Sequence, residues 1–226
     1  ADTETEKWLS VELANLLPGS RVVGEEAAYA DPRVFDRLAD ADPVWVIDPI
    51  DGTHNFTKGS DIFAIIVALV VGGETVAGWI YEPIGGALAQ GEQGAGVVLN
   101  ADRIQLDEHP SEASCDGVAA RHLFERADRD QSVIGDVFRP NCAGHEYIQI
   151  LRRERCFTAY TKLMPWDHAA GSFMIREAGG TSALLDGNRY DVAQPVGHLL
   201  SASDDKSWRR VQSILADNNE GRGNDG

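Results

Sequence analysis

The chain has 226 residues and a formal net charge of −16, from 20 basic and 36 acidic side chains. This excess of negative charge repels nucleic-acid phosphates and anionic lipid, so we expect neither nucleic acid nor a membrane as partner. The longest apolar run, residues 62–71, is too short to span a bilayer, and no secretion signal opens the chain. We therefore expect a cytoplasmic globular protein.

The first hundred residues predict a helix followed mainly by strands. The helix is expected to end at Pro18 and Gly19. Five apolar side chains are expected to fall near one of its faces: Trp8, Leu9, Leu13, Leu16 and Leu17. Short strands are predicted at 20–24 and 44–47, and two hairpins, at 63–81 and 86–100, complete a mostly antiparallel sheet by about Leu106.

A polar segment at 108–114, which contains Pro110, predicts a boundary between two subdomains, residues 1–110 and 111–226. Beyond it, helices and strands alternate. Helices are expected near 146–153, 168–178 and 205–216, and strands near 156–161, 181–187 and 197–203. This pattern predicts two α/β layers, the first antiparallel and the second mixed.

Three cysteines, Cys115, Cys142 and Cys156, lack the spacing of a metal or redox motif. We expect all three to be buried thiols.

The stretch "VWVIDPIDGTHNF" places two aspartates directly after an apolar strand. The proline between them fixes a turn, so the carboxylates of Asp48 and Asp51 and the carbonyl of Ile50 can face one space. If a helical turn begins here, the amides of Gly52 and Thr53 lie where a phosphate binds, beside the Thr53 hydroxyl. The alternative is an Asx turn that ends a strand.

Two further acids stand at element boundaries. Asp167 opens the helix in "PWDHAAGSFMIREAGG", where the alternative role is an N-cap, and Glu25 follows a strand, where a solvated acid is the alternative. If these acids converge with Asp48 and Asp51, each pair at ~4 Å repels by about 4 kcal/mol at an effective dielectric of 20. Oxygen ligands indicate Mg²⁺ or Mn²⁺ rather than zinc, and two such ions can clamp a phosphate ester.

In order and spacing, "GEE", "WVIDPIDGTHNF" and "PWDHAAGSFMIREAGG" resemble the three signature motifs of the inositol monophosphatase family. The resemblance implies a layered αβαβα sandwich, in the α+β or α/β class, of the inositol monophosphatase and fructose-1,6-bisphosphatase type. It also implies a lithium-sensitive phosphomonoesterase with two or three Mg²⁺ ions, for which Mn²⁺ is an alternative, and a homodimer.

The resemblance also implies a role for each motif residue. Glu25, Asp48 and the Ile50 carbonyl would hold the first metal, and Asp48 would bridge to a second metal that Asp51 and Asp167 complete. The amides of Gly52 and Thr53 would bind phosphate. Thr53, Glu25 and Asp48 would form the catalytic set, because Thr53 and the metal held by Glu25 activate the attacking water. Asp2 falls where the family keeps an aspartate near an optional third metal.

The chain departs from the family pattern at several positions. His54 replaces the second threonine of "DGTTNF" and contacts either substrate or solvent. Tyr160 stands where inositol-specific members carry an acidic residue, and Ala143 with His145 falls at the start of the sugar-contacting helix. A packed or surface position is the alternative for His145, and solvent is the alternative for Lys162. The family pattern also includes a helix and a lysine-bearing loop before Asp2.

We therefore expect a Mg²⁺-dependent phosphomonoesterase that uses two-metal-assisted in-line water attack on a small phosphorylated polyol or sugar. Inositol monophosphate is the leading substrate. Fructose 1,6-bisphosphate, histidinol phosphate and 3′-phosphoadenosine nucleotides remain alternatives, because the motifs bind only phosphate and metals. Two rival classes are a non-catalytic relative that binds a metabolite or partner and a calcium-binding structural module.

Overall fold

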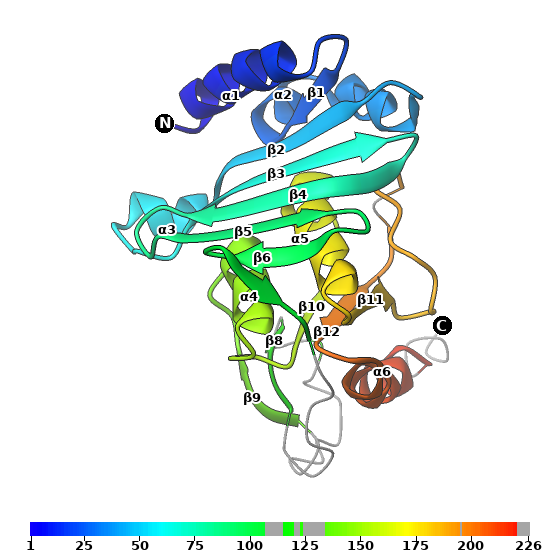
Figure 1. The fold of residues 1–226 in the computed structure, drawn as a ribbon. Helices are drawn as coiled ribbons and strands as arrows, with labels where there is room; N and C mark the ends of the chain where they lie inside the picture. Colours follow the sequence, from blue (N-terminus) through cyan, green and yellow to red (C-terminus); the bar gives the residue numbers. More distant parts are fainter. Residues whose placement is uncertain (107–114, 120–122, 124–133, 195, 221–226) are drawn as a thin grey trace.

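The computed structural model describes residues 1–106, 115–119, 123, 134–194 and 196–220. Helices and sheets alternate in layers along the molecule (Figure 1). Helices α1 (Asp2–Leu16) and α2 (Glu25–Ala30) lie against one face of the first sheet, and α4 (Ala143–Leu151) and α5 (Pro165–Glu177) fill the middle. Helix α6 (Asp205–Glu220) packs on the second sheet. The predicted αβαβα sandwich is confirmed.

The first sheet has seven strands that lie in chain order. They are β1 (Arg21–Gly24), β2 (Val44–Asp51), β3 (Ala64–Val71), β4 (Glu74–Glu82), β5 (Ala87–Glu92), β6 (Gly96–Leu99) and β7 (Asp102–Ile104). Strand β1 runs parallel to β2, and each later pair is antiparallel. Gly72 and Gly73 join β3 to β4 with positive φ angles of 58° and 80°, as a tight hairpin turn requires. Both predicted hairpins are confirmed.

The second sheet has the strand order β11-β12-β10-β8-β9. Its strands are β8 (Cys115–Ala119), β9 (Ile134–Phe138), β10 (Phe157–Tyr160), β11 (Thr181–Leu184) and β12 (Leu199–Ala202). Strand β8 runs parallel to β9 and β10, whereas β12 runs antiparallel to β10 and β11, so the predicted mixed sheet is confirmed. The predicted boundary at 110–111 lies outside the described residues and stays a prediction.

Two short elements complete the first half of the chain. A 3-10 helix, η1 (Pro32–Ala39), follows α2, and helix α3 (Thr53–Thr57) follows β2 directly. Neither was predicted as a separate element, although a helical turn was expected at α3. Across the described part of the chain, every helix is too short or too polar to cross a lipid bilayer.

Helix α5 is the central element, and most of its residues are buried against both sheets. Small residues allow this close packing. A Cβ on Gly78 of β4 would lie 3.0 Å from the Ala170 Cα, and one on Gly171 would lie 2.0 Å from the Tyr147 ring. This close packing of α5 brings Asp167, at the start of the helix, close to the end of β2.

The predicted apolar face of α1 is wrong in part. Trp8 is 63% exposed and Leu16 is 73% exposed, whereas Glu6 is 6% exposed. Because residues spaced by three or four share a helix face, the face that carries Glu6 also carries Leu9 and Leu13, which are half-buried. Trp8 lies two positions from Glu6 and therefore points to the opposite side.

The expectation of three thiols is also wrong. Cys115, at the start of β8, and Cys156, just before β10, form a disulfide across a Cα–Cα distance of 5.4 Å. The parallel pairing of β8 with β10 places the two cysteines side by side, which their sequence spacing did not indicate. Cys142 is a buried free thiol, as expected.

Candidate active site

Three aspartates converge between β2 and α5. Asp48, Asp51 and Asp167 each offer a carboxylate oxygen, and these oxygens lie within 4.8 Å of one another. Asp48 is 2% exposed and Asp51 is 7% exposed, so two of the three acids are buried. The convergence that the sequence predicted for these three residues is therefore present.

An irregularity in β2 lets Asp48 and Asp51 share this space. In a regular strand, residues three positions apart point to opposite faces of the sheet. The register between β2 and β3 shifts between Asp48 and Asp51, and the Ile50 amide donates a hydrogen bond of 3.0 Å to Asp48 Oδ1. Pro49, which cannot donate to a ladder, stands inside this bulge. The sequence "DPID" thus turns two carboxylates to one side.

The first turn of α4 holds Asp51 in place. Asp51 Oδ2 accepts a hydrogen bond of 2.6 Å from the Gly144 amide and one of 3.1 Å from the Cys142 thiol. A Cβ at Gly144 would lie 2.8 Å from the Ala64 Cβ, so glycine is needed for α4 to approach the sheet. Burial raises the pKa of Cys142, which therefore stays a thiol and donates.

Helix α2 presents Glu25, and Glu6 of α1 anchors that helix. The Glu6 carboxylate accepts hydrogen bonds from the amides of Glu26, at 2.8 Å, and Ala27, at 2.9 Å. It therefore satisfies amides at the N-terminus of α2 that the helix leaves without an internal partner. Glu25, the first residue of α2, shares a hydrogen bond with Asp48. The fourth predicted acid thus adjoins the aspartates.

Burial raises the pKa values of all four acids, and repulsion from neighbouring acids adds to this for Glu25, Asp48 and Asp167. Burial, together with the charges of Glu26 and Asp51, raises the pKa of Glu25 to about 7. Burial and the charges of Asp51 and Glu25 raise the pKa of Asp167 to about 8. Burial also raises the pKa values of Asp48 and Asp51. Divalent cations relieve such repulsion, and a set of carboxylate oxygens suits a hard ion such as Mg²⁺.

The turn after β2 has the geometry that its sequence predicts. Gly52 has a φ of 84° and opens α3 as its N-cap residue. A Cβ there would lie 3.2 Å from both the Cys142 Cβ and the Ile62 carbonyl oxygen, so both conformation and space favour glycine. Thr53 Oγ1 donates a hydrogen bond of 2.9 Å to the Ile50 carbonyl, which leaves the lone pairs of its oxygen as acceptors.

A cavity of about 160 Å³ adjoins the aspartates. We call it the acid-side cavity; its lining residues are Asp51, Arg139, Asn141, Cys142, Ala143, Glu146, Tyr160, Lys162, Asp167 and His168. Among the residues predicted to bind substrate, Ala143 and Tyr160 line it, and Lys162 does so as well. His54 is exposed and is not among the lining residues. His145 Nδ1 contacts a carboxylate oxygen of Glu82 instead.

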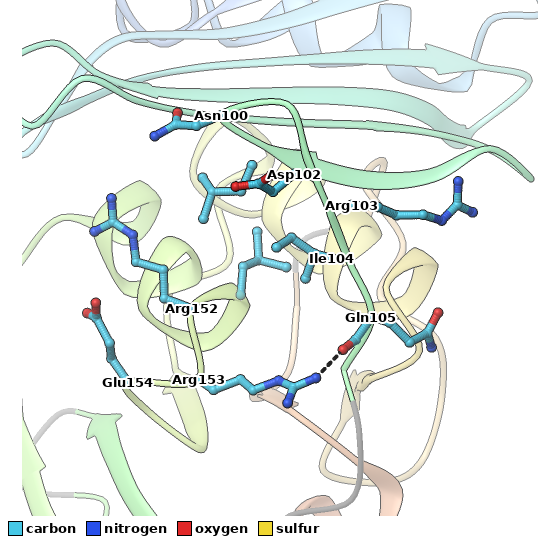
Figure 2. Close-up of a pocket in the computed structure, with 10 residues that line it drawn as sticks. Asn100, Asp102, Arg103, Ile104, Gln105, Arg152, Arg153 and Glu154 are labelled. Carbon is cyan, nitrogen blue, oxygen red and sulfur yellow. Dashed lines mark hydrogen bonds between the residues drawn. The ribbon is translucent and has the colours of Figure 1, made fainter.

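A larger cavity, of about 490 Å³, lies elsewhere, between the β6–β7 turn and the end of α4. Figure 2 shows that its arginine side chains point in different directions: Arg152 and Arg103 point away from each other, and Arg153 points to the Gln105 carbonyl. None of the converging acids lines this cavity. Catalysis requires reactive side chains that point to one space, and the acids do so only beside the smaller cavity of the two. The acid-side cavity is therefore the candidate active site.

Comparison with known proteins now identifies the family. The sequence profile of the inositol monophosphatase family matches residues 1–217. The chain belongs to this family. It is 33% identical over 218 residues to an inositol-1-monophosphatase of Caulobacter vibrioides, which covers 90% of this chain and 82% of that relative.

Two further members of the inositol monophosphatase family are similar to this chain along most of its length. The Nus factor SuhB of Xylella fastidiosa is 28% identical over 239 residues, which covers 98% of this chain and 82% of that protein. The solved structure of an IMPase from Thermotoga maritima has a TM-score of 0.79 at 24% identity and covers 96% of this chain and 83% of that one. At that identity the solved structure supports the fold alone.

Two acids near the inositol monophosphatase motifs were missed by sequence reasoning. Glu6 gave no local signal, because the amides that it caps lie about twenty positions further along the chain. Glu146 did give a signal: it is a lone acid among the apolar residues of "EYIQIL", which suggests a buried carboxyl. It is 1% exposed and lines the acid-side cavity.

Proposed function

We propose that this chain is a Mg²⁺-dependent phosphomonoesterase that hydrolyses a small phosphorylated polyol or sugar, with inositol monophosphate as the leading substrate. The observation that carries the proposal is the convergence of Asp48, Asp51 and Asp167 at the edge of a cavity of substrate size. Family membership supports phosphatase chemistry and leaves the substrate open.

The proposed ligands divide between two metal positions. Glu25, Asp48 and the Ile50 carbonyl would hold one ion, and Asp48, Asp51 and Asp167 would hold the second. Bound ions would supply Lewis-acid activation of water and charge stabilisation at the leaving oxygen. Asp51 is suited to this role because α4 saturates its Oδ2 with hydrogen bonds and leaves its other oxygen for a cation.

Thr53 is proposed to orient the attacking water. Its hydroxyl hydrogen points to the Ile50 carbonyl, so its oxygen can accept a hydrogen from a water that faces the phosphorus. The amides of Gly52 and Thr53 would hold the phosphate in line with that water. In the reaction, a bond forms between the water oxygen and phosphorus, the ester bond to the alcohol oxygen breaks, and the alcohol leaves with a proton.

A second candidate function is a partner-binding role. The relative named Nus factor SuhB belongs to the same family, so a member can carry a name for transcription rather than for catalysis. We rank this role second because Glu25, the three aspartates and Thr53 are all present here. Fructose 1,6-bisphosphate, histidinol phosphate and 3′-phosphoadenosine nucleotides remain alternative substrates.

We also propose that the chain forms a homodimer and works in the cytoplasm, with Mg²⁺ as its ion and Mn²⁺ as a substitute. The Cys115–Cys156 disulfide is uncommon in that compartment. The location is tested by denaturing the protein and alkylating its free thiols at the moment of cell lysis. Alkylation of all three cysteines fits a reducing cytoplasm, whereas alkylation of a single cysteine argues for an oxidising compartment.

Phosphate release tests the proposed activity. The chain is incubated with inositol, fructose, histidinol and nucleotide phosphates in Mg²⁺, in Ca²⁺ or in EDTA. We expect phosphate release in Mg²⁺ but not in Ca²⁺ or EDTA. Asp51→Asn should lower kcat by about 100-fold or more. Asp61→Asn, an exposed acid outside the cluster, is the matched control and should retain activity. Absence of release from every ester with Mg²⁺ would favour the partner-binding role.

A further inference from the structure

Tyr29 is an exposed aromatic residue of α2 that belongs neither to the aspartate cluster nor to the lining of the acid-side cavity. It is 67% exposed, yet its ring centroid lies 6.3 Å from that of Trp166, with 53° between the ring planes. Aromatic rings attract one another at centroid distances of about 4.5–7 Å. Most of the Tyr29 ring stays in solvent, so this contact adds little to the core and points to another role.

Both rings stand next to proposed metal ligands. Tyr29 follows Glu25 by four residues in α2, so the two side chains share one face of that helix. Trp166 directly precedes Asp167 in the first turn of α5. Glu25 is a proposed ligand of the first metal and Asp167 of the second. The ring pair therefore joins the two helices that supply these ligands, beside the ligands themselves.

Phe35 of η1 completes the packing on Trp166. Its ring centroid lies 5.5 Å from that of Trp166, and its side chain is half-buried. Trp166 itself is 3% exposed, so it offers the other two rings a fixed surface. Because α2 and η1 follow each other in the chain, both parts of this segment rest on the start of α5. We call Tyr29, Phe35 and Trp166 the aromatic clamp.

The aromatic clamp opposes an electrostatic repulsion. The negative charge of Glu25 acts on Asp167, and that of Asp51 acts on both. Like charges repel, so without a cation these acids push α2 and α5 apart. Glu6 holds the first amides of α2 from the side of α1, which leaves the distance between α2 and α5 to other contacts. Packing between apolar rings does not depend on the cation and is present before it binds.

We propose that Tyr29 is a positioning residue for the metal site: its ring, packed on Trp166, holds Glu25 at the distance from Asp167 at which divalent cations bind. The inference rests on the proposed function, because it takes Glu25 and Asp167 as metal ligands. A ligand that is in place before the cation arrives loses less freedom on binding, which favours affinity. Without the ring, repulsion moves α2 outward, and the cation must draw it back.

The test is a Mn²⁺ titration of the metal-free chain, with free Mn²⁺ measured by its electron paramagnetic resonance signal. Tyr29→Ala should weaken Mn²⁺ binding by about fivefold, which is in the range that one aromatic pair contributes. Tyr29→Phe keeps the ring and should bind Mn²⁺ as the wild type does. Tyr81→Ala, at a 40% exposed tyrosine on β4, is the matched control and should leave Mn²⁺ binding unchanged. Urea unfolding of each metal-free protein checks that it is folded.

A double substitution separates positioning from a general effect on the fold. Glu25→Gln removes the carboxylate that the ring is proposed to hold, so Tyr29→Ala should cause no further loss of Mn²⁺ affinity in that background. Additive losses would overturn the inference, and so would wild-type affinity in Tyr29→Ala or an equal loss in Tyr29→Phe.

The same titration distinguishes failure of this inference from failure of the proposed function. A wild type that binds no Mn²⁺ would contradict the metal site and, with it, the role of Tyr29. A wild type that binds Mn²⁺ but releases no phosphate from any ester would contradict the proposed activity alone. In that case the comparison of Tyr29→Ala with Tyr29→Phe still decides the role of the ring.

Discussion

Individual residues at the site are held by neighbours both outside and inside the motifs. Asp51 depends on the Gly144 amide and the Cys142 thiol, and Asp48 accepts from the Ile50 amide. These contacts turn acids that repel one another into a fixed group of ligands. Sequence reasoning predicted the acids because their types and order are distinctive. The apolar neighbours of Glu146 signal a buried carboxyl, but its hydrogen bond to Tyr160, fourteen positions away, could not be predicted.

Thr53 provides a test at the residue scale. Thr53→Ala removes the hydroxyl that is proposed to orient water, so kcat should fall by about 100-fold while KM changes less. Thr53→Ser keeps the hydroxyl and is the matched variant, expected to retain most of the activity. Steady-state kinetics with Mg²⁺ measure both variants. Equal kcat values for Thr53→Ala and the wild type would contradict the role proposed for this hydroxyl.

Among the secondary-structure elements, strands and hairpins were predicted well and helix faces less well. The glycine turn between β3 and β4 and the β-branched strands on either side are local signals, and both hairpins formed as expected. The face of α1 was misjudged because its buried residue is an acid, Glu6, rather than one of its apolar side chains. Burial of Glu6 follows from its contact with α2, which no local pattern reveals.

Helix α2 provides a test at the scale of elements. Glu6→Ala leaves the amides of Glu26 and Ala27 without their acceptor, so we expect a loss of about 1–2 kcal/mol in the free energy of unfolding. Because α2 carries Glu25, apparent Mg²⁺ affinity should fall as well. Glu12→Ala, an exposed acid on the same helix, is the control. Urea unfolding and the Mg²⁺ dependence of phosphate release measure the two effects; unchanged Mg²⁺ dependence in Glu6→Ala would argue against a link between α1 and the site.

At the scale of the whole molecule, the layered fold was predictable and the position of the site was predictable only in part. Motif order indicated the αβαβα sandwich, and the match over residues 1–217 places the chain in the family. The disulfide, the β8–β10 pairing and the acid-side cavity depend on contacts between distant segments. Such contacts are set by packing rather than by local propensity, so a single sequence carries little record of them.

The stability of the molecule should also depend on pH through Glu146. Its pKa is about 7 in the folded chain, against an ordinary value of 4.5, so the folded state retains a proton that the unfolded chain loses between these values. The contribution of Glu146 to the free energy of unfolding therefore falls as pH rises from 4.5 to 7, by up to about 3 kcal/mol.

Glu146→Gln removes this titration. Urea unfolding at constant Mg²⁺ should show the wild type losing stability relative to Glu146→Gln as pH rises from 5 to 8. Parallel pH profiles for the two proteins would mean that Glu146 does not titrate in this range when folded.

The central claim is that the converging acids hold divalent cations, and Mn²⁺ tests it most directly. Crystals soaked in Mn²⁺ are measured at a wavelength where manganese scatters anomalously. We predict anomalous density between Asp48, Asp51 and Asp167, with a second peak beside Glu25 and the Ile50 carbonyl, and loss of the first peak in Asp167→Asn. Saturated crystals without anomalous density at these aspartates would contradict the metal site and the mechanism built on it.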